Sequence, residues 1–244
     1  MFENSTVGDY RGYKCENFDL NGNKCTVVIP NEPCADKKWI WRAEFLGAFD
    51  SVDLDMLSKG YYLAYCAVCD RYGDPVSVEI FKGFYDHMVQ HGFNKKTVLF
   101  GFSRGGLYAC NYALKYPETV AALYLDAPVM NYLSCPYGIG KKAQPGFVEE
   151  FEKATGKTVS DMINYRNHPI DNAPKLLKSK LPIILVAGDS DAVVPYCENG
   201  AALFELYKSG GGEIELYLKP GCDHHPHGME DPSPIIDFML RHAE

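Results

Sequence analysis

Strand-like and helix-like segments alternate along most of the chain. The strand-like runs are short and apolar, and the helix-like runs repeat apolar residues at near-helical spacing. This alternation predicts an α/β fold with a mostly parallel sheet that is covered by helices on both faces. We expect strands at residues 61–68, 97–100, 121–125, 182–187 and 213–218, and helices at residues 50–59, 75–91, 108–114, 198–208 and 234–241.

The beginning of the chain follows a different pattern. Residues 9–30 contain two strand-like runs around Asn21-Gly22, a dipeptide whose tolerance of positive φ suits a tight hairpin turn. The sheet is therefore expected to begin with antiparallel strands.

One connection is much longer than the others. Residues 130–181 separate two predicted strands, which is far more than an ordinary crossover loop requires. This stretch contains two helix-like pieces, residues 147–154 and 159–165. We interpret a region at about 131–181 as a helical cap, inserted over the carboxyl edge of the sheet in a single domain that spans residues 1–244.

Composition narrows the class of protein. A chain of 244 residues can bury one large core, and its 46% hydrophobic and 23% charged residues are ordinary for a soluble globular protein. The formal charge of -8 argues against a nucleic-acid partner, because such domains are usually strongly basic on one face. No apolar run approaches the roughly 18 residues that span a bilayer, so no membrane partner is expected.

The cysteines bear on location. Nine of them occur without regular disulfide spacing, and the beginning of the chain lacks the basic and apolar stretches of an export signal. We expect a cytoplasmic protein, although a trimmed signal peptide would leave the same sequence. Cys66 and Cys69 end a predicted strand, and we interpret them as buried thiols because a redox pair of this spacing needs a helix N-terminus.

The turn after residues 97–100 carries a motif for nucleophilic chemistry. Gly101-Phe102-Ser103-Arg104-Gly105 lies between a predicted strand and a predicted helix, which is the setting of a G-x-S-x-G nucleophile elbow. The tight turn crowds the backbone, so we expect glycine to be needed at both ends of the motif, with Gly106 adding further room. Ser103 would then project its hydroxyl into the crevice at the carboxyl end of the strand.

A serine hydroxyl alone is a weak nucleophile, so a histidine base and a carboxylate are expected further along the chain. Asp189 and Asp191 follow the strand at 182–187 directly, at the same edge of the sheet as Ser103. Residues 221–228, with the sequence GCDHHPHG, follow the last predicted strand. The chain order is therefore serine, aspartate, histidine.

The histidines allow a second interpretation. His224, His225 and His227, beside Cys222 and Asp223, could instead bind zinc, since imidazole and thiolate suit that metal. We do not expect ligands packed so closely along an extended loop to converge, and no companion cluster completes a set of four. The sequence therefore predicts no metal and no cofactor.

Together these motifs resemble the α/β-hydrolase superfamily, specifically its small esterase-like and prolyl-oligopeptidase-like serine hydrolases of the type found among bacterial carbohydrate-degrading enzymes. The resemblance involves nearly the whole chain and implies the α/β-hydrolase fold. It rests on WIWR at 39–42, the GFSRGG elbow at 101–106, LDAP at 125–128, GDSDAVVP at 188–195 and GCDHHPHG at 221–228.

The resemblance also implies roles for single residues. In this fold the second aspartate of G-x-x-D-x-x-V-P points at the base, and G-x-x-H carries that base. This selects Asp191 as the orienting acid and His224 as the base, with His225 as its main rival. The backbone N–H of Arg104 would form half of the oxyanion hole. The lipase-type HGGG motif is absent from residues 31–45, where we nominate Trp41, or else Arg42, for the second donor.

The predicted activity is hydrolysis of a small-molecule carboxylic ester through an acyl-enzyme. Arg42, His225 and His227 are predicted to bind the substrate. An acylated or methyl-esterified carbohydrate is one ester that would fit such residues. Trp39, Trp41 and Tyr132 could stack on a sugar ring. Equally, the arginines could brace the loops and the tryptophans could fill the core. The alternatives are a serine peptidase and a non-catalytic binding protein with this fold.

Overall fold

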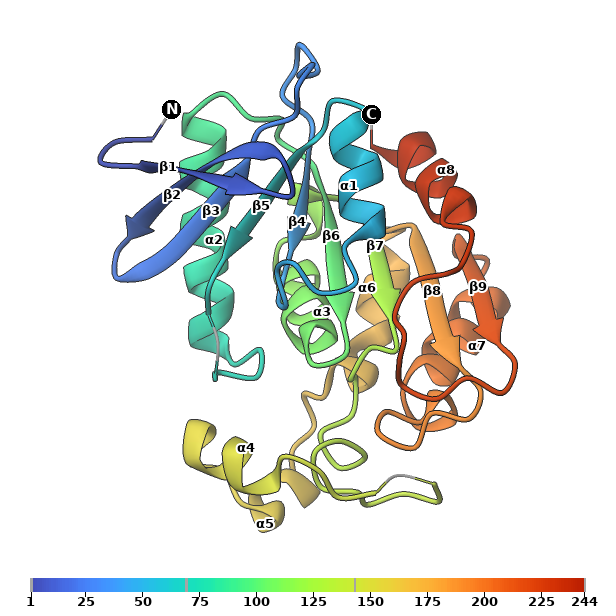
Figure 1. Cartoon of the computed structure of the whole chain (residues 1–244). Helices are drawn as coiled ribbons and strands as arrows, with labels where there is room; N and C mark the ends of the chain where they lie inside the picture. Colours follow the sequence, from blue (N-terminus) through green and yellow to red (C-terminus); the bar gives the residue numbers. More distant parts are fainter. Residues whose placement is uncertain (1, 69, 143, 244) are drawn as a thin grey trace.

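The computed structural model describes residues 2–68, 70–142 and 144–243, and its strands form one nine-stranded sheet (Figure 1). The strand order is β1-β2-β3-β5-β4-β6-β7-β8-β9. The pairs β1-β2, β2-β3 and β3-β5 are antiparallel and the other pairs are parallel, as the sequence predicted. The strands are β1 (Thr6–Tyr10), β2 (Tyr13–Leu20), β3 (Asn23–Val28), β4 (Trp39–Arg42), β5 (Tyr62–Cys66), β6 (Thr97–Phe102), β7 (Val120–Asp126), β8 (Ile183–Gly188) and β9 (Ile214–Lys219).

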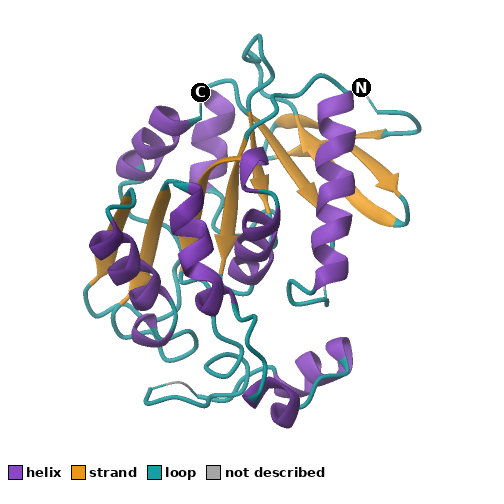
Figure 2. Cartoon of the chain, turned by 180° about the vertical axis from the view of Figure 1, so that it is seen from behind, coloured by secondary structure: helices purple, strands orange, loops and turns teal. Residues whose placement is uncertain are grey.

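Helices cover both faces of the sheet (Figure 2). The helices α1 and α8 pack on one face, and α2, α3, α6 and α7 pack on the other. They are α1 (Ser51–Ser58), α2 (Pro75–Gln90), α3 (Gly105–Lys115), α6 (Ala173–Ser179), α7 (Gly200–Gly210) and α8 (Ser233–His242).

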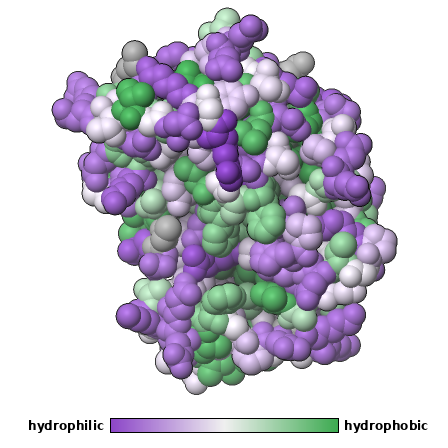
Figure 3. Space-filling view, in the orientation of Figure 1, coloured by the Kyte–Doolittle hydropathy of each residue, from purple (hydrophilic) through white to green (hydrophobic). Residues whose placement is uncertain are grey.

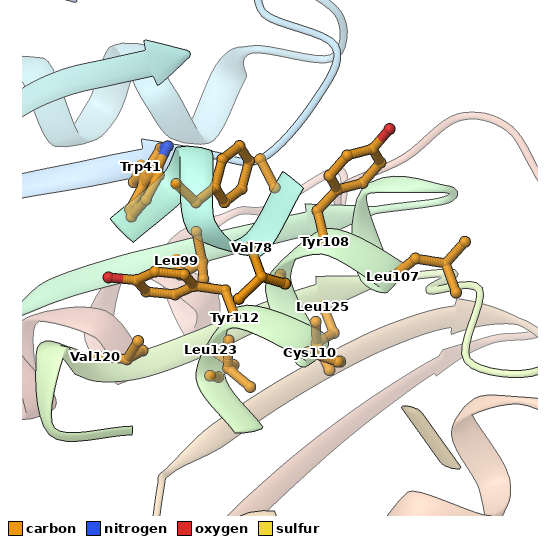
Figure 4. Close-up of a cluster of buried hydrophobic side chains, with 14 of the residues drawn as sticks. Trp41, Val78, Leu99, Leu107, Tyr108, Cys110, Tyr112, Val120, Leu123 and Leu125 are labelled. Carbon is orange, nitrogen blue, oxygen red and sulfur yellow. The ribbon is translucent and has the colours of Figure 1, made fainter. Parts of the chain in front are cut away.

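The core has two layers because alternate residues of a strand point to opposite faces of the sheet. Trp41 and Leu99 belong to the layer under α2 and α3, which Figure 4 shows around Tyr112. Ile40 and Phe100, their neighbours in sequence, belong to the layer under α1 and α8. The sheet is thus buried on both faces, which explains the continuously apolar strand sequences.

The strand β4 was not predicted. It lies between β5 and β6 in the middle of the sheet, and all four of its side chains are buried. Residues 39–42 give no clear signal of a buried strand, because they include Arg42 and arginine is almost never buried without a partner. Here the partner is Asp53 on α1, whose Oδ2 lies 2.6 Å from the Arg42 Nη2. The guanidinium also donates to the carbonyl oxygen of Phe49 at 3.0 Å.

The antiparallel start of the sheet contains two hairpins. Asn21 and Gly22 have φ values of 53° and 86°, which is the pair of positive φ angles that the predicted tight turn requires. A second turn at Arg11 and Gly12, with φ values of 54° and 88°, joins β1 to β2 and was not predicted. Arginine gives no sequence signal for positive φ, so this turn is hidden in the sequence.

The predicted helical cap is present, but its end differs. The helices α4 (Val148–Thr155) and α5 (Val159–Ile163) lie beyond the carboxyl ends of the parallel strands (Figure 1). The helix α6, which the prediction placed inside the cap, instead packs against α3 and α7 as an ordinary crossover helix. The part over the sheet edge therefore ends before residue 173, and we call residues 131–172 the insertion.

Aromatic side chains attach the insertion to the body of the fold. Phe151 of α4 is buried against the rings of Tyr72, Tyr132 and Tyr137. The Tyr132 hydroxyl donates a hydrogen bond of 2.8 Å to the carbonyl oxygen of Tyr72. These contacts set the position of α4 above the sheet edge.

The structure also bears on membrane spans and on the cysteines. Among the described parts of the chain, no helix is both long enough and apolar enough to cross a membrane. Cys66 is buried at the end of β5, as expected for a structural thiol. Cys69 lies outside the described residues.

Candidate active site

The nucleophile elbow forms between β6 and α3 where the sequence predicted it. Ser103 has a φ of 49°, in the left-handed region that non-glycine residues rarely adopt. Its N–H donates to the carbonyl oxygen of Asp126 at 2.9 Å, and its own carbonyl accepts from the N–H groups of Gly106 and Val129, each at 2.9 Å. The surrounding backbone therefore holds Ser103 in a strained conformation that exposes its hydroxyl at the sheet edge.

The glycines of the elbow do not all serve the same purpose. A Cβ on Gly101 would lie 2.9 Å from the Cβ of Ala109, and one on Gly106 would lie 2.6 Å from the Cβ of Pro128. A Cβ on Gly105 would meet nothing closer than 3.5 Å, which is ordinary van der Waals contact. The expectation that Gly105 relieves crowding is therefore wrong, and Gly106 has the role assigned to it.

The structure brings the hydroxyl of Ser103, the ring of His224 and the carboxylate of Asp191 together. The Nε2 of His224 lies 2.9 Å from the Ser103 Oγ, and its Nδ1 lies 2.8 Å from the Asp191 Oδ2. The three residues follow β6, β8 and β9, and they meet at the carboxyl edge of the sheet. His225, the rival for the role of base, is exposed and makes no hydrogen bond within the described residues.

The Asp191 carboxylate is held as an anion. Burial raises its pKa, but hydrogen bonds from His224 and from the N–H groups of Val194 and Val193 outweigh burial, so its pKa lies below 3.8. Its Oδ1 accepts both N–H groups, at 2.7 Å and 2.8 Å. Asp189 does not reach His224, because its carboxylate accepts hydrogen bonds from Ser190 and Gly221 in the turn.

A second pair of aspartate and histidine lies beside the first. Asp126 ends β7, is buried, and its Oδ1 lies 2.8 Å from the Nδ1 of His227. The Oδ2 of Asp126 accepts from the Tyr124 hydroxyl at 3.0 Å and from the Gly228 N–H at 2.6 Å. No role of its own was predicted for Asp126. Its signal was a carboxylate placed directly at the end of a buried strand on the edge that holds Ser103.

The rings of His224, His225 and His227 meet edge to face, with centroids 4.8 Å to 5.0 Å apart. One ring nitrogen from each lies within 4.8 Å of the others. The expectation that these residues cannot converge is therefore wrong. Partial burial and the neighbouring rings of His224 and His227 lower the pKa of His225 below 6.5.

Ser103 lines two pockets. The first, which we call the cap pocket, has a volume of about 210 Å³ and lies under the insertion. Apolar side chains make most of its wall: Leu107, Val129, Pro136, Phe147 and Val193. The second, which we call the histidine pocket, has a volume of about 270 Å³. Its wall includes Phe49, Phe102, His224, His225 and His227. Apolar surface gathers where the insertion meets the body of the molecule (Figure 3).

The backbone donors near Ser103 differ from those predicted. Trp41 lies inside β4 with strands on both sides, and its side chain is fully buried, so the nomination of its N–H for the oxyanion hole is wrong. Phe45, just beyond this strand, lines both pockets. Within the described residues, the backbone N–H groups of Phe45 and Arg104 donate no hydrogen bond. Both residues line the cap pocket together with Ser103.

Several side chains predicted to touch substrate belong to the core. Arg42 is wholly buried in its ion pair with Asp53, so the prediction that it binds substrate is wrong. Trp39 and Trp41 are 1% and 0% exposed, and stacking on a sugar ring is excluded for both. Tyr132 is also buried, with its hydroxyl bonded to the backbone. The interpretation that these residues fill the core and brace the loops is correct.

The Arg104 side chain connects the elbow to the insertion. Its Nε lies 2.8 Å from the Oε2 of Glu44, which is buried, and its Nη1 forms an ion pair with Glu150 on α4. Glu150 also accepts a hydrogen bond of 2.9 Å from the Tyr72 hydroxyl. Because two carboxylates already neutralise this guanidinium, it is a brace between α3 and α4.

Comparisons with known proteins agree with this fold. The sequence profile of the alpha/beta hydrolase fold matches residues 64–156. The acylamino-acid-releasing enzyme of Rattus norvegicus is 27% identical over 139 residues, which cover 55% of this chain and 18% of that enzyme. The acylaminoacyl peptidase of Pyrococcus horikoshii superposes with a TM-score of 0.67 at 15% identity, over 98% of this chain and 42% of that one.

A second solved structure is similar in size to this chain. The S-formylglutathione hydrolase of Agrobacterium tumefaciens superposes with a TM-score of 0.64 at 16% identity, over 98% of this chain and 97% of that one. The chain has the α/β-hydrolase fold, as the sequence predicted. It spans 18% of the length of the curated relatives that it matches.

Proposed function

We propose that the chain is a serine hydrolase that cleaves a carboxylic ester through an acyl-enzyme, with Ser103 as nucleophile, His224 as base and Asp191 as orienting acid. One observation carries the proposal. Two hydrogen bonds, of 2.9 Å and 2.8 Å, link the Ser103 hydroxyl through His224 to a carboxylate, at the point where two pockets meet.

The hydrogen bonds fix which proton moves. The ionised Asp191 can only accept, so the Nδ1 of His224 carries the proton between them and Nε2 is left with a lone pair. That lone pair takes the Ser103 proton as the Oγ attacks the carbonyl carbon, and the imidazolium then gives the proton to the leaving alcohol. Water repeats the sequence on the acyl-enzyme and releases the acid.

The developing oxyanion needs hydrogen-bond donors. We assign this role to the backbone N–H groups of Arg104 and Phe45, which have no other acceptor within the described residues and whose residues line the cap pocket with Ser103. Loss of one such donor typically costs about 2.7–4 kcal/mol of transition-state stabilisation. Arg104 thus contributes its backbone to the reaction, while its side chain holds the elbow against the insertion.

The two pockets assign the two halves of the ester. His224 lines the histidine pocket and must reach the leaving oxygen, so the alcohol half belongs there. His225 and His227 line the same pocket, and their imidazole nitrogens can hydrogen-bond to hydroxyl groups of that alcohol. The apolar cap pocket then receives the acyl half. We therefore propose an apolar acyl group on a polar alcohol, a description that an acylated carbohydrate fits.

A second candidate is hydrolysis of N-acylated amino acid amides. The specific observation that favours it is the similarity to acylamino-acid-releasing enzymes, which are 27% identical over the matched residues. Ester and amide hydrolysis use the same three side chains, so the two candidates differ in the leaving group that the histidine pocket accepts. Rates on matched acetyl ester and N-acetylalanine anilide substrates distinguish them.

The test uses the purified chain with 4-nitrophenyl acetate and a fluorophosphonate probe. We expect release of nitrophenol and covalent labelling of Ser103, and the Ser103→Ala variant should lose both. Ser190→Ala is the matched control, because within the described residues this hydroxyl bonds only to the turn residue Asp189, and the variant should keep both activities. A wild-type chain that neither hydrolyses the ester nor takes the probe would support a non-catalytic binding protein instead.

A further inference from the structure

We propose that His224, His225 and His227 form a binding site for a divalent zinc ion, and that zinc in this site switches the hydrolase off. The binding itself is independent of the proposed function, whereas the inhibition depends on it. The first observation is the convergence of one ring nitrogen from each histidine to within 4.8 Å of the others.

The second observation is the support behind two of the three rings. Histidines that bind a metal almost always donate their other ring N–H to a carboxylate or carbonyl, which fixes the tautomer and makes the free nitrogen more basic. The Nδ1 of His224 lies 2.8 Å from Asp191, and the Nδ1 of His227 lies 2.8 Å from Asp126. Both carboxylates are buried, so both rings are held with the Nε2 atom left as the metal ligand.

The third ring can complete the set. Zinc binds imidazole nitrogen at about 2.0–2.1 Å, so ligands in a tetrahedral site lie about 3.4 Å apart. Closing the largest separation of 4.8 Å requires a shift of at most roughly 1.4 Å. His225 is the ring best able to move, because its side chain is exposed and makes no hydrogen bond within the described residues, and its ring stacks on that of Phe49 with centroids 5.1 Å apart.

The site overlaps the reaction chemistry at a single atom. The Nε2 of His224 accepts a hydrogen bond from the Ser103 hydroxyl at 2.9 Å through its lone pair. The same lone pair would bind the metal. A bound zinc ion therefore takes the base away from Ser103 without any covalent change, and removal of the metal restores it. Three imidazoles leave a fourth tetrahedral position for water, a borderline set that suits zinc and does not suit magnesium.

The test titrates the metal-free full chain with Co²⁺, whose visible absorption reports tetrahedral binding, and then displaces the cobalt with Zn²⁺. We expect one metal ion per chain, no response to Mg²⁺, and at least a tenfold loss of affinity in His225→Ala, which removes an exposed ligand and leaves the core intact. Ser103→Ala should keep its affinity, because the hydroxyl is displaced rather than bound. In wild-type protein, stoichiometric zinc should abolish ester hydrolysis, and a chelator should restore it.

His91→Ala is the matched control. His87 and His91 form another histidine pair, on α2 and just beyond its end, with ring centroids 4.3 Å apart, so a general affinity for surface histidines would act there. Loss of cobalt binding in His91→Ala but not in His225→Ala would overturn the proposal, as would thiolate charge-transfer bands or the absence of a tetrahedral spectrum. If the metal-free chain has no hydrolase activity, the proposed function fails, and the cobalt spectrum still decides the zinc site.

Discussion

Replacement of Asp191 by asparagine tests the proposed chemistry most sharply, because the structure fixes which way the new amide must face. The Oδ1 of Asp191 accepts two N–H groups, from Val193 at 2.8 Å and Val194 at 2.7 Å. The amide oxygen must take that position, since an amino group there would oppose two donors. The amino group then faces His224 and donates to its Nδ1, which forces the imidazole proton onto Nε2. In that tautomer His224 cannot accept the proton of Ser103.

The magnitude follows from the hydrogen bonds involved. Turning the amide round would leave two buried N–H groups without acceptors, at about 1–3 kcal/mol each, so the unproductive tautomer dominates. The same substitution in a serine protease triad lowers kcat by about 10⁴, which corresponds to about 5.4 kcal/mol of activation free energy. We expect a loss of this order in kcat for 4-nitrophenyl acetate, with KM changed little because the pockets are untouched.

The assay compares initial rates and melting temperatures of wild type, Asp191→Asn and the control Asp189→Asn. Among the residues that the structure describes, the Asp189 carboxylate accepts hydrogen bonds only from the Ser190 hydroxyl and the Gly221 N–H, so its replacement should leave kcat within about threefold. If a folded Asp191→Asn protein kept kcat within about tenfold of wild type, the tautomer argument and the assigned role of Asp191 would both be refuted.

Three further expectations concern stability. Gly106→Ala should lower the free energy of unfolding by about 1–3 kcal/mol, since its Cβ would lie 2.6 Å from a proline Cβ, whereas Gly105→Ala should cost less than about 1 kcal/mol; urea denaturation of both variants decides this. Asp53→Ala should cost about 3–5 kcal/mol, because it leaves Arg42 buried without its partner, and exchanging both residues for leucine and methionine should cost less in the same measurement. The pKa of Asp191 is depressed by folding, so its contribution to stability is present above pH 3.8 and is lost as the pH falls through the folded value; thermal melts across that range should show a smaller loss in Asp191→Asn.

The alternating elements were predictable because their signals are local. Apolar runs and helical spacing lie within single segments, and the turn at Asn21-Gly22 uses residues that favour positive φ. The strand β4 was missed because burial of Arg42 depends on Asp53, a partner on another element that no local pattern reveals. The end of the insertion was misplaced for a similar reason, since only packing against α3 and α7 distinguishes a crossover helix from a cap helix.

The candidate site divides in the same way. Ser103 and its expected partners could be predicted because each follows a strand, and parallel strands deliver such residues to one edge. The pairing of Asp126 with His227 joins residues 101 positions apart, so no local pattern in the sequence reveals it. The meeting of three neighbouring histidines was missed because an extended loop was assumed for residues 221–228.

The position of Ser103 between two chambers has a consequence for how such a chain can diversify. Pro136 and Glu150 of the insertion line one chamber alone, residues after β9 line the other alone, and the two chambers share Phe45, Phe147 and Val193. Substitutions in one stretch can therefore alter the fit of one end of a ligand while the opposite end keeps its contacts. The preference for one end of the ligand can therefore change while the reacting residues stay in place.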